Sequence, residues 1–476
     1  MAVQEKLKVG IFGIGLDTYW PQFKGLKERL EGYQQEIAKQ IDGFGYVDLV
    51  DAGLVDNPER SRAVGSLFRQ QQVDVIFLYI STYALSSTVL PVAQETGVPI
   101  VVLNIQPVAA IDYEGFNNLG DRGTMTGEWL AHCQACCVPE IASVFNRAGI
   151  EYHLVTGYLG EDRTTGALKE WVEAAKVAKT MRTNRLGVMG HYYAGMLDVY
   201  TDVTKQISAF GGHVDLIEID ELAELRDGVT EKEVREKIGE FRKSFEVSSE
   251  CDSDEVDRAA RTSVALEKLV AKHHLGSLAY YYEGTGGSKH EDIVTSVIAG
   301  NTLLTGKNVP VAGECEIKNA QAMKIMDSFG AGGSFSEFYA MDFNDGIVLL
   351  GHDGPAHFAI AEGSVGLVPL PVYHGKPGKG LSIQMTVKHG PVTLLSVCEG
   401  PEGVYMITAE GECVEGPVLH IGNTNSRYRF DLPPREFVER WSKMGPSHHC
   451  AIGVGHVASR LEKLGELLGI PVARIC

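Results

Sequence analysis

Short apolar runs alternate with amphipathic segments along the first third of the chain, and this alternation restricts the possible folds more than any other feature. The apolar runs have the length and composition of buried strands, and they lie at residues 8–12, 46–50, 73–79 and 100–103. The segments between them have helical spacing, at residues 22–40, 57–69 and 85–95. Strands that alternate with helices predict a parallel sheet covered on both faces.

The same pattern completes this unit and then begins again. A helical stretch at 121–148, expected to break or kink at Pro139, precedes a strand at 152–156 and a helix at 165–180. Further strands are predicted at 185–189, 214–217, 277–281 and 309–311, with helices between them, one of them at 194–210. The sequence therefore predicts a second α/β unit.

The composition changes after about residue 330. Glycine, valine and threonine become frequent, and alternating runs such as LSIQMTVKH are typical of antiparallel strands. Helices are expected again only at 434–443 and 457–468. The predicted fold class is α/β, with two Rossmann-like doubly wound domains at 1–180 and 181–328, followed by a C-terminal β-rich domain with terminal helices at 329–476.

The charge balance excludes some classes of partner. The chain has 62 acidic and 43 basic residues, and its net charge of −19 repels a phosphate backbone. No apolar run is long enough to cross a membrane, and the first residues enter a strand pattern without the features of a signal peptide. We therefore expect a cytoplasmic protein without nucleic-acid or membrane partners.

The cysteines do not predict a disulfide scaffold, because there are only nine, an odd number, in 476 residues. Cys133, Cys136 and Cys137, with His132 beside them, come closest to a zinc pattern. No second pair follows at zinc-finger spacing, and the stretch has a helical apolar pattern. We expect buried thiols here, since a free cysteine behaves as a small hydrophobic residue.

Two glycine-rich segments suggest a nucleotide site at first sight, but neither has the required spacing. VGIFGIG at 9–15 departs from the dinucleotide pattern G-x-G-x-x-G, and EGTGGSKH at 283–290 departs from the phosphate-loop pattern. Both predict tight turns between a strand and a helix. Ligands bind near such turns in open α/β sheets, so a substrate contact remains an alternative.

The segment at 309–357 and SHHC at 447–450 hold the most informative polar residues. Glu314 follows a short apolar strand and a glycine, at a strand end where α/β enzymes place catalytic groups. Glu337 lies among aromatic residues in SFSEFYAMDF, where an inward-facing carboxylate requires a partner. His352 follows a strand in LLGHDGPAH, and SHHC adds another histidine.

Two glutamates and two histidines form a mixed set of oxygen and nitrogen donors. Such a set suits Mn²⁺, Co²⁺ or Mg²⁺ better than a structural zinc, which prefers thiolates. Two carboxylates beside a cation also suit proton transfer at a carbon and at a hydroxyl, through an enediolate. Each residue alone has an ordinary alternative as a surface, capping or core group. We expect the neighbouring Glu316, Asp342 and Asp345 to be surface or capping carboxylates.

These residues and their order resemble the L-arabinose isomerase family, within the arabinose/fucose isomerase group. GECEIKNA matches the family's first metal glutamate at Glu314, and FSEFY matches the second at Glu337. LLGH matches the first metal histidine at His352, and the second histidine of SHHC matches the last one at His449. The family's domain plan, two α/β domains and a β-rich domain, also agrees with the pattern.

The resemblance implies a divalent-metal-dependent aldose–ketose sugar isomerase that acts through a cis-enediol. It implies Mn²⁺, or Co²⁺ or Mg²⁺, as the cofactor, with the ligands Glu314, Glu337, His352 and His449. The two glutamates would share the catalytic proton transfers. His448 would contact the sugar or support the site, because adjacent residues of an extended segment point in opposite directions. The family is commonly a hexamer, which implies a homo-oligomer with active sites at subunit contacts.

The N-terminal domain departs from the family where sugar contacts are expected. GIGLDTYW at 13–20 lacks the family's Gly-Ser-Gln, and NNLGDRGTMTG at 117–127 lacks its Asn-Gln-Thr-Ala-His. The identity of the sugar is therefore open. Candidate replacement contacts, for which loop capping is an equal alternative, are Asp17, Tyr19, Asp121, Arg122 and Thr124. Tyr193, in the turn that begins the second domain, is another candidate.

Two other classes of function remain as alternatives. Paired α/β lobes also form sugar clefts in non-catalytic binding or sensor proteins, although such a protein has no need of a cation flanked by two bases. Another metal-enediolate enzyme, an epimerase or an aldolase, would use the same four groups. The sequence does not determine the sugar, the preferred metal or the number of subunits.

Overall fold

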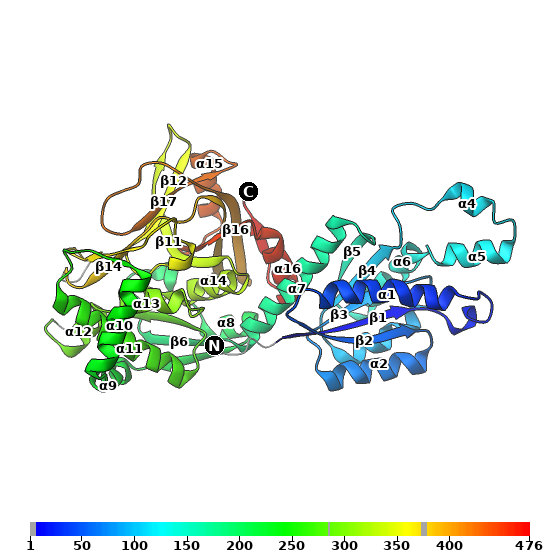
Figure 1. Cartoon of the computed structure of the whole chain (residues 1–476), viewed down its shortest axis with the longest axis horizontal. Helices are drawn as coiled ribbons and strands as arrows, with labels where there is room; N and C mark the ends of the chain where they lie inside the picture. The colour runs from blue at the N-terminus through cyan, green and yellow to red at the C-terminus, as the bar shows by residue number, and fades with distance from the viewer. Residues whose placement is uncertain (1–5, 284–285, 373–377) are drawn as a thin grey trace. The chain divides into compact units, whose positions relative to one another are not determined.

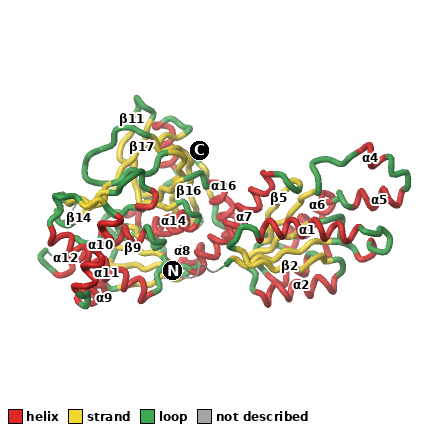
Figure 2. Tube along the Cα trace, in the orientation of Figure 1, coloured by secondary structure: helices red, strands yellow, loops and turns green. Residues whose placement is uncertain are grey.

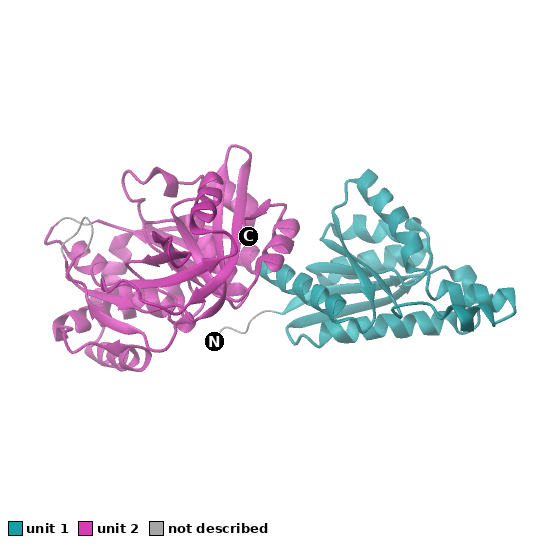
Figure 3. Ribbon diagram, turned by 90° about the horizontal axis from the view of Figure 1, so that it is seen from above, with its two compact units in different colours: residues 1–179 teal, residues 180–476 magenta. Residues whose placement is uncertain are grey.

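The structure is a computed structural model, and it describes residues 6–283, 286–372 and 378–476 (Figure 1). Helices and strands alternate along the first part of the chain, and strands are the main element after residue 330 (Figure 2). The chain divides into two compact units, which we call unit 1 (Met1–Lys179) and unit 2 (Thr180–Cys476) (Figure 3). The division into three domains stays a prediction.

Unit 1 is built on a five-stranded parallel sheet in the order β2-β1-β3-β4-β5. Consecutive side chains such as Ile11 and Phe12, which point to opposite faces of the sheet, are both buried, so both faces are covered. The predicted parallel α/β sheet is confirmed. Its order differs from the 3-2-1-4-5-6 order of dinucleotide-binding folds, so the Rossmann-like part of the prediction is not confirmed.

The strands of unit 1 are β1 (Leu7–Ile14), β2 (Val47–Val55), β3 (Val75–Tyr79), β4 (Ile100–Gln106) and β5 (Tyr152–Tyr158). Its helices are α1 (Leu26–Asp42), α2 (Pro58–Gln71), α3 (Leu90–Thr96), α4 (Tyr113–Asn117), α5 (Arg122–Leu130) and α6 (Gln134–Ala148), and α7 (Asp162–Thr183) leads into unit 2.

Several predicted helices have different bounds in the structure, and two of them differ for a clear physical reason. The break expected at Pro139 is wrong, because α6 continues through this residue and the break lies between α5 and α6. The Gln134 amide fixes the turn there by donating to the Ala131 carbonyl. The helix predicted at 194–210 begins only at α8 (Val203–Phe210), because the Asp202 carboxylate accepts hydrogen bonds from the first backbone N–H groups of α8.

Unit 2 begins with a four-stranded parallel sheet in the order β10-β9-β6-β7. Its strands are β6 (Arg185–Gly190), β7 (His213–Ile217), β9 (Ser277–Tyr281) and β10 (Val311–Ala312). The helices of this part, besides α8, are α9 (Ile219–Asp227), α10 (Glu231–Ser244), α11 (Ser253–His273), α12 (Lys289–Val294), α13 (Ile298–Thr305) and α14 (Ile317–Ser328).

The rest of unit 2 is mainly an antiparallel β-barrel. Its strands pair in the order β15-β18-β11-β12-β17-β16, and β16 pairs back with β15 to close the barrel. They are β11 (Gly332–Asp342), β12 (Ile347–His352), β15 (Gly390–Gly400), β16 (Gly403–Val414), β17 (Thr424–Phe430) and β18 (His449–Val454). The predicted β-rich region is therefore confirmed.

Smaller elements surround the barrel. A short strand, β19 (Val472–Arg474), pairs in parallel with β16. A separate sheet joins β14 (Leu381–Gln384), β13 (Gly366–Pro369) and β8 (Glu246–Val247). The last helices are α15 (Pro434–Lys443) and α16 (Ala458–Leu468), close to the predicted bounds. In the described part of the chain, no helix is both long and apolar enough to cross a membrane.

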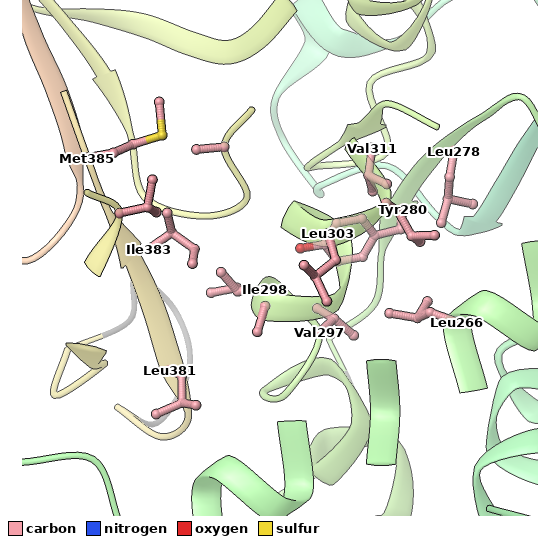
Figure 4. Close-up of a cluster of buried hydrophobic side chains, with 14 of the residues drawn as sticks. Leu266, Leu278, Tyr280, Val297, Ile298, Leu303, Val311, Leu381, Ile383 and Met385 are labelled. Atoms are coloured by element: carbon pink, nitrogen blue, oxygen red, sulfur yellow. The ribbon is translucent and has the colours of Figure 1, made fainter. Parts of the chain in front are cut away.

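One hydrophobic core joins the parallel sheet of unit 2 to the barrel. It contains Leu278 of β9, Leu394 of β15 and Ile452 of β18. Figure 4 shows side chains at and beside α13, among them Ile298, between those of β9 and those of β14. α14 contacts both the parallel sheet and the barrel, and its residues 317–326 are all buried. The turn that contains Glu314 leads directly into α14, which packs against both the sheet and the barrel.

Leu394 provides a test of this shared core. Leu394→Ala removes a fully buried side chain and leaves a cavity. We expect the free energy of unfolding to fall by about 2–5 kcal/mol, measured by urea unfolding of the full chain. The matched control is Leu216→Ala on β7, where the side chain is 81% exposed and the expected change is about 0.5 kcal/mol or less. Equal losses from both variants would contradict the assigned core.

Candidate metal centre

Glu314 lies in a strained turn at the carboxyl end of β10. Its φ is +56° and that of Cys315 is +60°, a left-handed conformation that costs about 1–2 kcal/mol for each residue with a Cβ. Backbone hydrogen bonds hold the turn, since Cys315 donates to the Tyr280 carbonyl and Glu316 donates to the Gly313 carbonyl. Strain of this kind persists where the surrounding structure fixes the backbone, and it is common at functional sites.

Three neighbouring barrel strands bring further polar residues together. In the register of β11 and β18, Glu337 lies opposite His449, and side chains directly opposite one another share a face of the sheet. β12 pairs with the other edge of β11. There Gly351 lies opposite Glu337, and His352 is the residue after Gly351. Residues separated by more than a hundred positions in the sequence therefore meet around the middle of β11.

Glu314, His352 and His449 form the first of two groups of possible metal ligands. Each offers one ligand atom, and the three atoms lie within 4.8 Å of one another. Glu314 Oε2 is 3.4 Å from His449 Nε2. The second group, within the same limit, consists of Glu337, His448 and His449. All four predicted metal ligands thus belong to these two groups, while their roles stay a prediction.

The first group fits a cation because each of its side chains has a buried polar atom without a hydrogen-bond partner among the described residues. Glu314 Oε2, His352 Nδ1 and His449 Nε2 are buried, and none of them has a hydrogen bond to any residue that the structure describes. A buried polar atom left unsatisfied costs about 1–3 kcal/mol. A divalent cation accepts lone pairs from carboxylate oxygen and imidazole nitrogen, so it would satisfy the ligand atoms that these three residues bring together.

His449 is oriented by Glu316. The Glu316 side chain is buried, and its Oε2 accepts a hydrogen bond from His449 Nδ1. An ionised carboxylate can only accept, so Nδ1 carries the proton and the lone pair of Nε2 is directed toward Glu314. A carboxylate behind the imidazole is the usual support of a ligating histidine. The expectation that Glu316 is a surface or capping group is wrong, because its side chain turns inward to His449.

His352 is neutral and packs against Phe335. Burial lowers the pKa of His352 well below its usual value, and the nearby imidazoles of His449 and His448 lower it further. Neutral imidazole is the form that binds a metal. The Phe335 ring has its centroid 4.4 Å from that of His352 and 4.3 Å from that of His449, so one buried aromatic ring supports both imidazoles.

His448 is held by Asp198, a contact that the sequence does not predict. The backbone N–H of His448 donates to Asp198 Oδ2 over 3.0 Å, and His448 Nδ1 lies 2.6 Å from the same oxygen. Burial lowers the pKa of His448, but the carboxylates of Glu314 and Asp198 outweigh this effect and raise the pKa to about 9. No sequence pattern links Asp198 to a histidine 250 positions away.

The two adjacent histidines do not point in opposite directions. The ring centroids of His448 and His449 are 3.8 Å apart, and His448 Nε2 lies 3.6 Å from Glu314 Oε2. The expectation of opposite directions is wrong because β18 begins only at His449, so the alternation of a strand does not extend to His448. Both rings therefore border the same carboxylate.

Tyr193 also lies at this site. Its backbone N–H donates to the Glu314 carbonyl over 3.4 Å, and its ring centroid is 4.8 Å from that of Tyr281. Tyr193 follows β6 and Tyr281 is the last residue of β9, and the carboxyl ends of these two strands lie beside each other in the parallel sheet. Tyr193 is thus placed where a substrate contact is predicted, next to the backbone of Glu314.

The other predicted sugar contacts belong to unit 1. Asp121 caps α5, since its carboxylate accepts hydrogen bonds from both the N–H and the hydroxyl of Thr124. Asp17 and Arg122 are exposed. Tyr19 is half-buried, with its ring centroid 5.9 Å from that of Phe23. The hydrogen bonds between Asp121 and Thr124 agree with the capping alternative. That Asp17, Tyr19, Asp121, Arg122 and Thr124 contact a sugar stays a prediction.

Comparison with known proteins gives a consistent set of relatives. No protein-family profile matches the chain. A sulfoquinovose isomerase of Alkalicoccus urumqiensis is 23% identical over 320 residues, which cover 65% of this chain and 68% of that protein. An L-arabinose isomerase of Nocardioides sp. is 22% identical over 345 residues, 69% of this chain and 67% of that protein. A sulfoquinovose isomerase of Priestia megaterium is 19% identical over 93% of this chain and 95% of that protein.

The chain is therefore a divergent relative of these isomerases, and the resemblance seen in the motifs is confirmed. The relatives support the predicted class of enzyme, an aldose–ketose isomerase, which is an intramolecular oxidoreductase. Among solved structures, a periplasmic solute-binding protein of Actinobacillus succinogenes with bound D-allose is 13% identical, over 63% of this chain and 82% of that chain. Its TM-score is 0.17, so no conclusion rests on this likeness.

The position of Glu316 leads to a test of metal binding. Glu316→Gln leaves His449 without its charged partner, and we expect Mn²⁺ affinity to fall about 10–100-fold. The measurement is calorimetric titration of chelator-treated protein with Mn²⁺. Glu236→Gln, the same change at a side chain that is 65% exposed on α10, is the matched control and should keep the parent affinity. Parent affinity in Glu316→Gln would contradict the positioning role.

Proposed function

We propose that this chain is a divalent-metal-dependent aldose–ketose isomerase that converts a pentose, hexose or related sugar through a cis-enediol. The observation that carries the proposal is the meeting of Glu314, His352 and His449, each of which has a buried polar atom without a hydrogen-bond partner within the described residues. The similarity to sulfoquinovose and L-arabinose isomerases supports the class of reaction.

The proposed cation ligands are Glu314, Glu337, His352 and His449. Two carboxylates and two imidazoles suit Mn²⁺, with Co²⁺ or Mg²⁺ as alternatives. When bound, the cation would polarise the sugar oxygens and stabilise the negative charge that develops on them. Glu316 accepts a hydrogen bond from Nδ1 of His449, and Phe335 packs against both imidazole rings. The chain thus supplies both the ligands and the side chains that orient them.

The two glutamates would carry out the proton transfers. In this reaction a proton leaves C2 of the aldose, which gives the cis-enediol, and a proton then returns at C1 to give the ketose. A second proton passes from the hydroxyl at O2 to the oxygen at C1. One glutamate serves the carbon atoms and the other serves the oxygens. Glu314 follows β10 and Glu337 belongs to β11, so the two carboxylates approach from separate elements.

His448 and Tyr193 would orient the sugar. The Asp198 carboxylate contacts both Nδ1 and the backbone N–H of His448, so Nε2 of this ring is directed toward Glu314. From this position Nε2 would donate a hydrogen bond to a sugar oxygen. Tyr193 lies beside the Glu314 turn, where its backbone N–H donates to the Glu314 carbonyl, and it would limit the space for the sugar chain.

The proposal extends to a homo-oligomer with active sites at subunit contacts, and a hexamer is the size common in the family. In such an assembly the unit 1 candidates Asp17, Tyr19, Asp121 and Thr124 would contact a sugar held by a neighbouring subunit. Light scattering of the purified chain measures the number of subunits directly.

A panel of aldoses and ketoses tests the reaction. We expect at least one pair to interconvert with added Mn²⁺, and the panel includes L-arabinose and sulfoquinovose, which the names of the relatives suggest. NMR in deuterium oxide identifies the product and the carbon that exchanges its proton. Turnover should stop after chelation and return with Mn²⁺ or Co²⁺. Binding without turnover would indicate a sensor protein, and inversion at one carbon without movement of the carbonyl would indicate an epimerase.

The glutamates provide a test of mechanism. Glu314→Gln and Glu337→Gln each remove a proton acceptor but keep the side-chain volume, and we expect kcat to fall by at least about 10²–10⁴-fold. Circular dichroism and urea unfolding check that the fold is intact. Glu236→Gln, exposed on α10, is the control for the chemical change and should leave kcat unchanged. Turnover near the parent rate in either variant would exclude that glutamate from the proton transfers.

A further inference from the structure

The turn between α5 and α6 holds two cysteine sulfurs next to each other. Cys133 occupies the N-cap position of α6, and Cys136 lies in the first turn of that helix. Their Sγ atoms are 2.7 Å apart, and both thiols are free. The sulfurs of a disulfide are about 2.05 Å apart, so a shift of about 0.7 Å brings this pair to bonding distance.

Neighbouring side chains fix the turn in this arrangement. The buried amide of Gln134 donates to the carbonyls of Ser81 and Ala131, each over 2.9 Å. The Cys137 thiol donates to the Ala84 carbonyl over 2.8 Å. These bonds tie the start of α6 to the segment after β3. The pair is therefore held together by its surroundings, and Cys137 is already engaged elsewhere.

The two sulfurs differ in their access to solvent. Cys136 is exposed, whereas Cys133 and Cys137 are buried. The expectation of buried thiols is thus confirmed for Cys133 and Cys137 and wrong for Cys136. Burial, together with the neighbouring Cys136 thiol, raises the pKa of Cys133 to about 12. A reagent from solution therefore meets Cys136 first, and Cys133 is placed to react with it afterwards.

The geometry does not favour a metal at this place. His132 Nε2 is 3.1 Å from Glu128 Oε1 and 3.4 Å from Arg29 Nη2, so the imidazole is engaged by charged groups. Within the described residues, neither group of possible metal ligands includes one of these cysteines. The two neighbouring sulfurs therefore favour thiol–disulfide chemistry at this turn.

We propose that Cys133 and Cys136 are a redox modification site, at which a small-molecule disulfide converts the two thiols into a reversible intramolecular disulfide. The site uses no residue of the candidate metal centre, and it does not depend on the proposed isomerase activity.

The reaction balances in two exchange steps. The Cys136 thiolate attacks one sulfur of the small disulfide R–S–S–R, which forms a mixed disulfide and releases one R–S⁻. Cys133 loses its proton and attacks Cys136 Sγ, which forms the internal bond and releases the second R–S⁻. The protein thiols lose two electrons and two protons. The reagent takes up the electrons, and its two thiolates take up the protons.

Mass spectrometry of the full chain tests the proposal, with oxidised glutathione as the probe. After oxidation and alkylation of the remaining thiols, we expect the peptide that contains Cys133 and Cys136 to lack two hydrogens and to carry no alkyl group on either residue. Dithiothreitol should restore both thiols. Fragmentation of the peptide distinguishes this bond from one between Cys136 and Cys137.

Three variants give matched controls. Cys133→Ser should accumulate the mixed disulfide with glutathione on Cys136, because no second thiol completes the exchange. Cys136→Ser should lose the modification, and Cys251→Ser, at a half-buried cysteine of unit 2, should leave it unchanged. The test on the parent sequence can overturn the proposal, whatever the stability of the variants. It does so if Cys136 stays alkylatable, keeps the mixed disulfide or forms its bond with Cys137.

Discussion

A buried atom that carries a lone pair but meets no donor destabilises a protein by about 1–3 kcal/mol, and unit 2 gathers three such atoms in one place. Glu314 Oε2, His352 Nδ1 and His449 Nε2 have no hydrogen-bond partner among residues 6–283, 286–372 and 378–476. The left-handed backbone of Glu314 and Cys315 adds strain at the same point. A bound divalent cation would offset this local cost, and its binding would account for the position of these unfavourable features beside one another.

The rest of unit 2 supports this arrangement from two sides. α14 begins directly after the Glu314 turn, and its burial between the parallel sheet and the barrel fixes the turn in position. The pairing of β11 with β12 and β18 places Glu337 opposite His449 and next to the end of β12. Side chains behind the proposed ligands complete the support, because Glu316 fixes the tautomer of His449 and Asp198 fixes the ring of His448.

The sequence predicts those parts that depend on local patterns. Alternating apolar runs and helical segments identify the parallel sheets, and the order of the motifs around Glu314, Glu337, His352 and His449 identifies the relatives. It does not predict contacts between distant polar residues. Glu316 is separated from His449 by 133 positions, and a carboxylate near a helix start has the same local pattern whether it caps the helix or turns inward. The directions of His448 and His449 were also unpredictable, because they depend on where β18 begins.

The most direct test of the metal centre is a crystal structure of the chain grown with Mn²⁺, with anomalous differences recorded near the manganese edge. The proposed centre predicts one strong peak bounded by the carboxylates of Glu314 and Glu337 and the imidazoles of His352 and His449. A structure without a peak there, or with manganese bound only at other residues, would contradict the proposed centre.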